Sequence, residues 1–293
     1  MQSASRPVEV LRVGPGSGVS AFDVAAAEEP LEIRLGDRPY VVIMRTPGAD
    51  RELAAGFLLA EQIVRSADEI GSIRHCAAPP GEGGGEEVNG NVLNVWLTGE
   101  AASRAAAMLT RTRAVTSSTS CGVCGRQSID DLMCDVPPVR ARWTIPSGAV
   151  AAMPDRLRAA QAVFAETGGL HAAALFDRTG ALARAAEDVG RHNAVDKVIG
   201  AELLAGHVPL SDRVLFVSGR TSFEILQKAL VAGIPVVASV SAPSSLAVEL
   251  ARDGHVTLLG FVRGSTFNIY AGPERVTLDG PAHVRPGASV RQT

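Results

Sequence analysis

The chain has 293 residues, a net charge of −3 and 20% charged residues. This length suits one large domain or two modest ones, and the charge argues against a general nucleic-acid-binding protein, which would carry a basic excess. No apolar run approaches the ~20 residues that a membrane-spanning helix requires. The first residues, Met1 to Pro7, show no basic stretch followed by an apolar one, so we expect a cytoplasmic protein without a secretory signal.

The N-terminal part is predicted to be a small α+β domain, at residues 29–135, behind a loose lead-in at residues 1–28. Turn residues at 36–39 separate two alternating runs, which predicts a β-hairpin. Asp50 is placed to cap a helix with an apolar stripe. The expected elements are strands at 31–35 and 40–45, a helix at 51–65, a mobile loop at 79–87, a strand at 88–97 and a helix at 101–109.

A proline-rich stretch at 133–147 predicts the boundary of a second domain, at residues 136–293. Its apolar strands alternate with helices, which is typical of a buried, largely parallel sheet and of the α/β class. Thr221 to Glu224 has the spacing of a capping box at a helix start. The expected strands are 171–177, 181–187, 213–217, 235–240 and 255–262, and the expected helices are 155–167, 193–204, 222–231 and 245–252.

Two cysteines, Cys121 and Cys124, lie in a run of Gly, Ser and Thr residues and carry the strongest chemical signal. Thiolates three positions apart can share a metal ion, close a disulfide or pass a sulfur atom between them. A zinc site needs two further ligands, and a thioredoxin-like redox pair fits a Ser/Thr run poorly. The remaining candidate ligands form no second closely spaced pair; they are Cys76, Cys134, His75, His171 and His192.

The stretch from Glu187 to Lys197 crowds charged side chains around a glycine at a strand-to-helix turn. A solvated helix start would explain these charges. The turn also presents Arg191, His192 and Asn193 together, and such a group of donors can hold phosphate or orient a reacting group. We favour the second interpretation.

Two further polar segments, Ser218 to Ser222 and Ser241 to Ser245, each follow a strand and open a helix. Ordinary N-capping would account for either one. Both lie at the carboxyl ends of strands, where open α/β sheets bind ligands, and one carries Arg220. Together they favour an anionic, nucleotide-like ligand, although neither is a Walker loop and no G-x-G-x-x-G motif is present.

The stretch from Gly260 to Asn268 leaves the last apolar strand with Arg263 beside a glycine. Phe261 and Phe267 are available there for stacking on a purine or pterin ring. A β-turn with core aromatic residues is the alternative interpretation of this segment.

These segments in combination resemble the FdhD family of sulfur carrier proteins, over about residues 29–270. The resemblance rests on Ser120 to Gly125, Glu187 to Lys197, Ser218 to Arg220 and Val240 to Ala247. It implies a fold similar to that of cytidine deaminases, with a smaller N-terminal part and a homodimeric assembly. It does not bring deaminase chemistry, because a zinc deaminase has His-x-Glu upstream of Pro-Cys-x-x-Cys, whereas here the cysteines precede His171 and position 173 is Ala.

The resemblance implies a sulfurtransferase that takes sulfur from a cysteine desulfurase as a persulfide on Cys121, with Cys124 as its companion. The sulfur would pass to a molybdenum cofactor, bis-molybdopterin guanine dinucleotide, before insertion into formate dehydrogenase, and GDP-like nucleotides would mimic this substrate. No resident metal ion is expected. The alternatives are a cofactor-binding chaperone with structural cysteines and a zinc-dependent nucleoside hydrolase. The residues expected to contact the cofactor are Gly260, Phe261, Val262, Arg263, Gly264, Ser265, Thr266, Arg220, Ser244, Ser245, Arg191 and His192.

Overall fold

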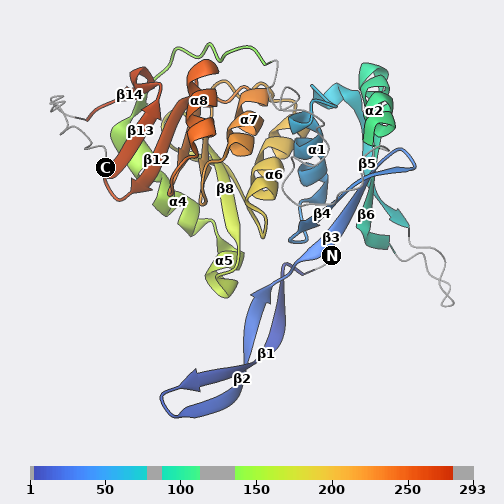
Figure 1. Ribbon diagram of the computed structural model, residues 1–293, viewed down its shortest axis with the longest axis vertical. Helices are drawn as coiled ribbons and strands as arrows, with labels where there is room; N and C mark the ends of the chain where they lie inside the picture. The colour runs from blue at the N-terminus through green and yellow to red at the C-terminus, as the bar shows by residue number, and fades with distance from the viewer. Residues whose placement is uncertain (1–2, 78–87, 113–135, 280–293) are drawn as a thin grey trace.

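The computed structural model of the chain describes residues 3–77, 88–112 and 136–279. A larger sheet of six strands and a smaller sheet of four lie side by side, and a long hairpin projects from the molecule (Figure 1). The expected α/β class is confirmed. The segment around Cys121 and the loop expected at 79–87 lie outside the described residues, and the likeness to cytidine deaminases stays a prediction.

The larger sheet has the strand order β13-β12-β11-β10-β8-β9. Its strands β10, β11 and β12 are parallel, as their apolar runs predicted. The flanking strands are antiparallel because β8–β9 and β12–β13 are hairpins rather than helical crossovers, so the sheet is mixed and only its centre is parallel. The strands are β8 (His171–Phe176), β9 (Leu182–Asp188), β10 (Val214–Val217), β11 (Val236–Ser239), β12 (Thr257–Arg263) and β13 (Thr266–Ala271).

Helices cover both faces of the larger sheet, because alternate strand residues point to opposite sides. On one face, α6 (Arg191–Leu204), α7 (Phe223–Val231) and α8 (Ser245–Asp253) share a core with Leu215 and Val237. On the other, α3 (Ser147–Ala151) and α4 (Met153–Ala159) enclose Phe216. The single helix expected at 155–167 is two helices, since α5 (Ala162–Thr167) begins separately. The short parallel strands are β7 (Ile145–Pro146) and β14 (Val276–Thr277).

The smaller sheet has the order β4-β3-β6-β5 and confirms the predicted hairpin and the strand at 88–97. Its inner face shares the first core with helices α1 and α2. Within the described ranges, no helix is long and apolar enough to cross a bilayer. The elements are β3 (Glu29–Leu35), β4 (Arg38–Arg45), α1 (Asp50–Ala60), the 3₁₀ helix η1 (Ala67–Glu69), β5 (Ile70–Ala77), β6 (Val88–Leu97) and α2 (Gly99–Thr112).

The predicted cap of α1 was wrong. Ala49, in the left-handed region with φ 53°, precedes the helix, and the helix ends at Ala60 rather than at residue 65. The Asp50 carboxylate instead accepts hydrogen bonds of 2.9 and 3.0 Å from Arg45, whose side chain is fully buried. A buried guanidinium needs a charged partner, so the Asp50 carboxylate neutralises Arg45 and does not cap the backbone N–H groups at the helix start.

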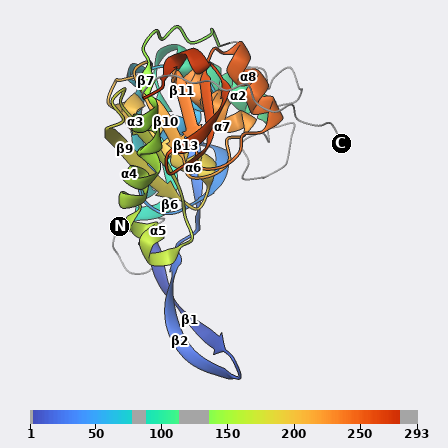
Figure 2. The ribbon, with the colours of Figure 1, turned by 90° about the vertical axis from the view of Figure 1, so that its left-hand side faces the viewer.

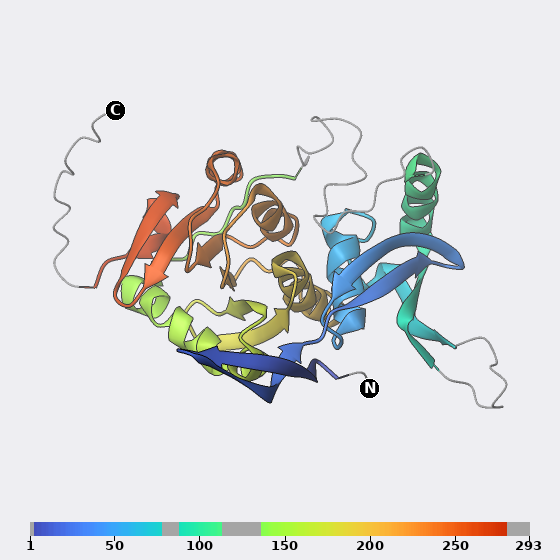
Figure 3. The same ribbon diagram turned by 60° about the horizontal axis from the view of Figure 1, so that its bottom comes forward.

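Helices α1 and α6 join the smaller sheet to the larger one (Figure 3). A Cβ added at Gly200 would lie 1.9 Å from the carbonyl oxygen of Glu52, and one added at Gly56 would lie 2.0 Å from that of Asp196. Only glycine allows this approach of the two backbones. One continuous hydrophobic core therefore spans both sheets. The predicted boundary at residues 135 and 136 stays a prediction.

The expected loose lead-in is instead a regular hairpin of two ten-residue strands, β1 (Ser5–Gly14) and β2 (Ser17–Ala26), which we call the arm. Composition suggested a loop, but Val8, Val10, Val13, Val19 and Val24 favour strands. At the base of the arm, Arg6 contacts Glu29, and Ser5 donates a 3.2 Å hydrogen bond to Glu166. The rest of the arm extends away from the body (Figure 2).

Candidate ligand site at one edge of the larger sheet

The predicted polar segments converge at the edge of the larger sheet where β10, β11 and β12 end, which we call the carboxyl edge. Parallel strands bring their carboxyl ends together. β8 runs against β10, so His171 begins at this edge, and Asp188 pairs with His171 across the β8–β9 hairpin. Open α/β sheets bind ligands at this edge, so the tertiary structure unites residues that are far apart in the sequence.

The loops after β10 and β11 are tied to each other. Thr221 forms a bridge with Pro243, and its carbonyl oxygen accepts a 3.0 Å hydrogen bond from the Ser244 backbone. Ser244 also caps α8 by accepting from the Ala247 backbone at 3.2 Å. Ser245 begins α8 and is exposed, as is Arg220. Ordinary capping thus explains Ser244, while Arg220 and Ser245 remain accessible to a ligand.

The C-terminal half of β12 forms the next part of the edge. A Cβ at Gly260 would lie 2.9 Å from Tyr270 and 3.1 Å from Pro243, so no larger residue fits there. Phe261 has φ 54° and donates its backbone N–H to the Ser241 carbonyl at 3.1 Å. The Arg263 guanidinium lies 5.6 Å from the Phe261 ring and donates to the Val240 carbonyl at 3.1 Å.

The remaining predicted residues of this segment differ in how far they can reach a ligand. Val262 is fully buried in the second core, and Phe267 is partly buried because it packs against that core. Phe261 is 37% exposed and is the aromatic ring at this position that a ligand could reach. Gly264, Ser265 and Thr266 are exposed at the turn between β12 and β13.

Helix α6 begins at the carboxyl edge and presents Arg191 there. A Cβ at Gly219 would lie 3.6 Å from Arg191 Cδ and 3.5 Å from His171 Nδ1, so both side chains lie close to the loop after β10. Among the described residues, the buried Nε of Arg191 and the buried hydroxyl of Thr221 have no hydrogen-bond partner. Unpaired buried donors are costly, so this edge has unused capacity to donate to an acceptor.

His192 forms a buried pair with Glu224 that the sequence analysis missed. The His192 Nε2 atom lies 3.2 Å from Glu224 Oε2 and 3.3 Å from the Ser222 hydroxyl. Burial raises the pKa of Glu224 to about 7, and burial together with the Arg191 charge lowers the pKa of His192 to about 3. Between about pH 3 and about pH 7 the carboxyl is protonated and the imidazole is neutral, so the pair is uncharged, and above pH 7 it is anionic.

The predicted capping box is also wrong in its details. Ser222, not Thr221, is the N-cap residue of α7, and its side chain caps no backbone N–H group. Glu224 contacts His192 instead of reaching back to the helix start. His192 is the second residue of α6, a different helix, so residue spacing within α7 could not predict its contact with Glu224.

Asp188 is a buried anchor rather than part of a ligand-binding donor cluster. Its carboxylate lies 2.7 Å from Lys197 Nζ and accepts hydrogen bonds of 2.8 Å from both Asn193 and the Gly190 backbone. Its second oxygen accepts from the Thr46 backbone at 3.2 Å, 142 residues away. Asn193 and Lys197 therefore hold the start of α6 in place, and only Arg191 and His192 of the predicted group face the edge.

An open pocket of about 630 Å³ adjoins the carboxyl edge. His171, Ser218 and Val240 line it from the sheet, and Arg158 stacks on Phe164, 4.2 Å from the ring centroid, on its helical side. Burial and the charge of Arg191 lower the pKa of His171, which keeps this imidazole neutral at neutral pH. The pocket offers an apolar floor and hydrogen-bonding groups to a planar ring system.

The predicted nucleophile, Cys121, lies outside the described residues, as do Cys124 and Cys134. Cys76 is the free cysteine of the described part, on β5. The described residues contain no group of three or more His, Cys, Asp and Glu side chains that could hold a metal ion. The zinc interpretation thus gains no support from His75, His171 or His192.

Comparisons with known proteins agree on one family. The model of the FdhD/NarQ family matches residues 26–277. The sulfur carrier protein FdhD of Streptomyces avermitilis is 48% identical over 277 residues, which are 92% of this chain and 95% of that protein. The protein of the same name from Anaeromyxobacter dehalogenans is 50% identical over 271 residues, which are 90% and 92% of the two chains.

The fold is shared with a crystal structure of a putative formate dehydrogenase accessory protein from Desulfotalea psychrophila. Its TM-score is 0.73 at 24% identity, and the match covers 94% of this chain and all of the other. With the family model matched over most of the chain and relatives about half identical in sequence, the chain belongs to the FdhD/NarQ family.

Proposed function

We propose that this protein is a sulfur carrier that receives sulfane sulfur from a cysteine desulfurase on Cys121 and delivers it to bis-molybdopterin guanine dinucleotide, the cofactor of formate dehydrogenase. The observation that carries this proposal is the carboxyl edge, where unpaired donors, an accessible arginine and an exposed phenylalanine meet beside a pocket. Relatives bearing the name sulfur carrier protein, and a structural neighbour described as a formate dehydrogenase accessory protein, support it.

The first transfer requires an ionised thiol. The Cys121 thiolate attacks the outer sulfur of the desulfurase persulfide, an S–S bond forms on Cys121, and the S–S bond of the donor breaks to release the donor thiolate. The product is a Cys121 persulfide. No electrons are gained or lost overall, because the sulfane sulfur moves with its oxidation state unchanged.

The second transfer uses Cys124 as the reductant. Attack of the Cys124 thiolate on the inner sulfur of the Cys121 persulfide forms a Cys121–Cys124 disulfide and releases hydrosulfide. Two thiol sulfurs are oxidised and the sulfane sulfur is reduced to sulfide. The sulfide then replaces an oxygen ligand of the molybdenum, which leaves as hydroxide, and cellular thiols reopen the disulfide.

The carboxyl edge would hold the guanine dinucleotide of this substrate. Phosphates favour helix N-termini and arginines, and the starts of α6, α7 and α8 meet here with Arg191, Arg220 and Arg263. A guanine or pterin ring fits the pocket beside His171. His192 acts through its pair with Glu224 and not as a direct phosphate ligand, because the imidazole is neutral and already bonded.

The sulfur step is tested by mass spectrometry after incubation with a cysteine desulfurase and cysteine. The wild-type chain should gain the mass of one sulfur atom, and Cys121→Ala should not. Cys124→Ser should gain the sulfur but fail to release it as hydrosulfide. Absence of the gain in the wild-type chain would instead support a cofactor chaperone with structural cysteines, and stoichiometric zinc in the purified protein would support the hydrolase.

The cofactor step is tested separately by titration with GDP as a mimic. The combined change Arg220→Ala and Arg263→Ala should weaken GDP binding and reduce its salt dependence. Arg252→Ala is the matched control, because it removes an exposed arginine from the far end of α8. Tight, salt-sensitive binding that survives the double change would contradict this placement of the ligand.

A further inference from the structure

Glu224 is a carboxyl group buried at the start of α7 without a cation bonded to it. Its side chain is 12% exposed, and its Oε2 atom lies 3.2 Å from Nε2 of His192, which is equally buried. Within the described part of the chain, Glu224 forms no ion pair with a lysine or an arginine, and the nearby Lys228 is bonded to Asp196 at 2.8 and 2.9 Å. A negative charge on Glu224 is therefore compensated only at a distance.

Charged groups of both signs surround Glu224 and largely offset one another. They are Arg191 and Asp196 of α6, Lys228 of α7, Glu61 next to the end of α1, and His171 of β8, which acts through His192. Burial dominates and raises the pKa of Glu224 to about 7. Burial also lowers the pKa of His192 to about 3, so the imidazole adds no positive charge. The charge of the pair is thus set by Glu224 alone.

The first turn of α7 is suited to hold an anion. The helix has nine residues, and the side chain of its N-cap residue, Ser222, caps no backbone N–H group. Directly before Ser222, the side chain of Thr221 is 0% exposed, and its hydroxyl group has no hydrogen-bond partner among the described residues. The buried Nε atom of Arg191 lacks a partner there as well. These donors favour a phosphate group at the start of α7.

Glu224 belongs to the same first turn and competes with such an anion. An anion at the N–H groups of this turn would lie within about 10 Å of the Glu224 carboxyl group, since one turn rises about 5.4 Å. When ionised, Glu224 itself uses the favourable potential of the helix start and repels a second negative charge. One charge at about 10 Å, at an effective dielectric constant of about 20, raises the pKa of a carboxyl group by about one pH unit.

We propose, on the basis of the nucleotide binding proposed above, that Glu224 couples anion binding at the carboxyl edge to the uptake of one proton. The proton comes from the solvent and is held by the Glu224 carboxyl group beside His192, and no bond of the ligand changes. By linkage, the bound phosphate keeps Glu224 protonated to a higher pH, and loss of that proton weakens binding by the same factor. Glu224 is a positioning residue, because it acts through the charge that it places beside Arg191.

Titration of the full chain with GDP at pH 6 and pH 8.5 tests the coupling. Glu224→Gln keeps this position uncharged at every pH. The terminal phosphate of GDP also loses a proton near pH ~6, and the variant measures that contribution alone. The two chains should bind alike at pH 6. At pH 8.5 the wild-type chain should bind about eightfold more weakly than the variant, which corresponds to the rise of about one pH unit.

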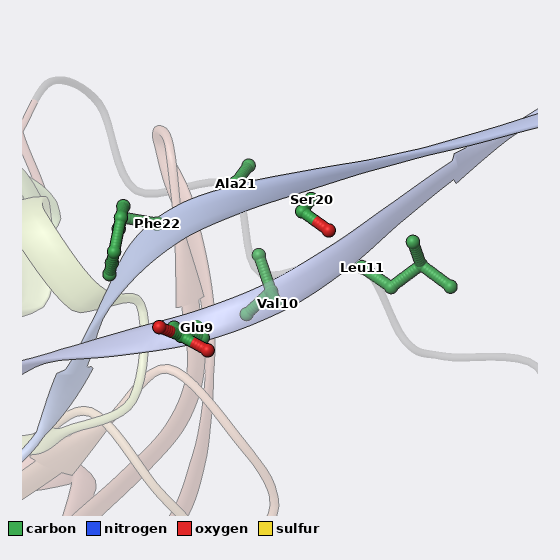
Figure 4. Close-up of a pocket in the computed structure, with 6 residues that line it drawn as sticks. All are labelled: Glu9, Val10, Leu11, Ser20, Ala21 and Phe22. Carbon is green, nitrogen blue, oxygen red and sulfur yellow. The ribbon is translucent and has the colours of Figure 1, made fainter.

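Calorimetry in buffers of different ionisation enthalpy counts the protons directly. At pH 7.5, where GDP is almost fully ionised, the wild-type chain should take up about half a proton on binding and Glu224→Gln none. The wild-type count needs no variant. Glu9→Gln is the matched control and should behave as the wild type, because Glu9 is an exposed carboxylate on the arm (Figure 4), away from α7 (Figure 1).

The outcomes separate the coupling from the ligand site itself. Equal affinities of wild type and Glu224→Gln at pH 8.5, or a wild-type chain that binds GDP at pH 7.5 without taking up a proton, would overturn the coupling and leave the nucleotide site in place. A wild-type chain that fails to bind GDP even at pH 6 would overturn the site and the coupling together.

Discussion

Replacing Gly200 by alanine should destabilise the protein, although Gly200 lies inside helix α6. Alanine in place of a helical glycine ordinarily stabilises by roughly 0.5–1 kcal/mol. Here the new Cβ would lie 1.9 Å from the Glu52 carbonyl oxygen, whereas ordinary contact begins at 3.4 Å. Helices α1 and α6 would have to separate by the difference between these two distances, 1.5 Å.

The size of the effect follows from this separation. Overpacking of a tight contact costs about 1–3 kcal/mol and occasionally more, and separation also weakens dispersion contacts along both helices. After the gain in helix propensity, we expect a net loss of about 2 kcal/mol in the free energy of unfolding. For a chain of 293 residues, that loss would lower Tm by about 3 °C.

Denaturant unfolding at fixed pH measures the change directly. Ala201→Gly, one position further along α6, isolates the propensity effect and should cost only about 0.5–1 kcal/mol. Because α6 carries Arg191 and His192 to the carboxyl edge, Gly200→Ala should also weaken GDP binding if the proposed function holds. A Gly200→Ala variant as stable as the wild type would show that α1 and α6 do not touch as described.

Three further predictions concern the carboxyl edge and its support. Burial raises the pKa of Glu224 in the folded protein from 4.5 to about 7, so its contribution to stability is complete below pH 4.5 and is lost as the pH rises through 7. Glu224→Gln should therefore flatten the fall in the free energy of unfolding between pH 5 and 8. A pH profile of stability that this change leaves unaltered would contradict the burial of the carboxyl group. Lys228 donates to Asp196 at 2.8 and 2.9 Å in a fully buried pair. Lys228→Met alone should lower the free energy of unfolding by about 3–5 kcal/mol, measured by thermal unfolding, because it leaves the Asp196 charge buried and unpaired, and the double change Lys228→Met with Asp196→Leu should lower it much less. Equal losses for the single and the double variant would argue against the ion pair. Gly260→Ala should place a Cβ 2.9 Å from Tyr270 and lower the affinity for GDP in calorimetry, and unaltered affinity would remove Gly260 from the site.

Local sequence patterns predicted most elements of the larger sheet. β10 is apolar at every position, and β11 and β12 are apolar at most positions, because both faces of these strands are covered. The hairpin of β8 and β9 turns at Asp177 to Gly180, where turn residues interrupt two strand-like runs. These features depend on residues close together in the chain, so periodicity and turn chemistry suffice to predict them.

The same reasoning failed where a charged or polar side chain has a partner far along the chain. Asp50 and Glu224 both have the spacing of helix-capping residues, but the Asp50 carboxylate pairs with Arg45 and the Glu224 carboxyl contacts His192 instead. The glycines and serines of the arm are typical of a loop, but residues 5–14 and 17–26 form two paired strands. Composition alone does not distinguish a loop from a pair of strands, and spacing alone does not distinguish a helix-capping residue from a member of a buried ion pair.

Motifs and local patterns are enough to predict the family, most strands and helices of the larger sheet, and the polar segments that follow its central strands. Which of those polar residues remain free to meet a ligand, and which are bound within the fold, depends on packing between distant parts of the chain. Asp188 is the clearest case, because its bond to Thr46 spans 142 residues. Such a contact is set by the approach of α1 to α6, which depends on two glycines far apart in the chain and on the shared core that draws the two sheets together.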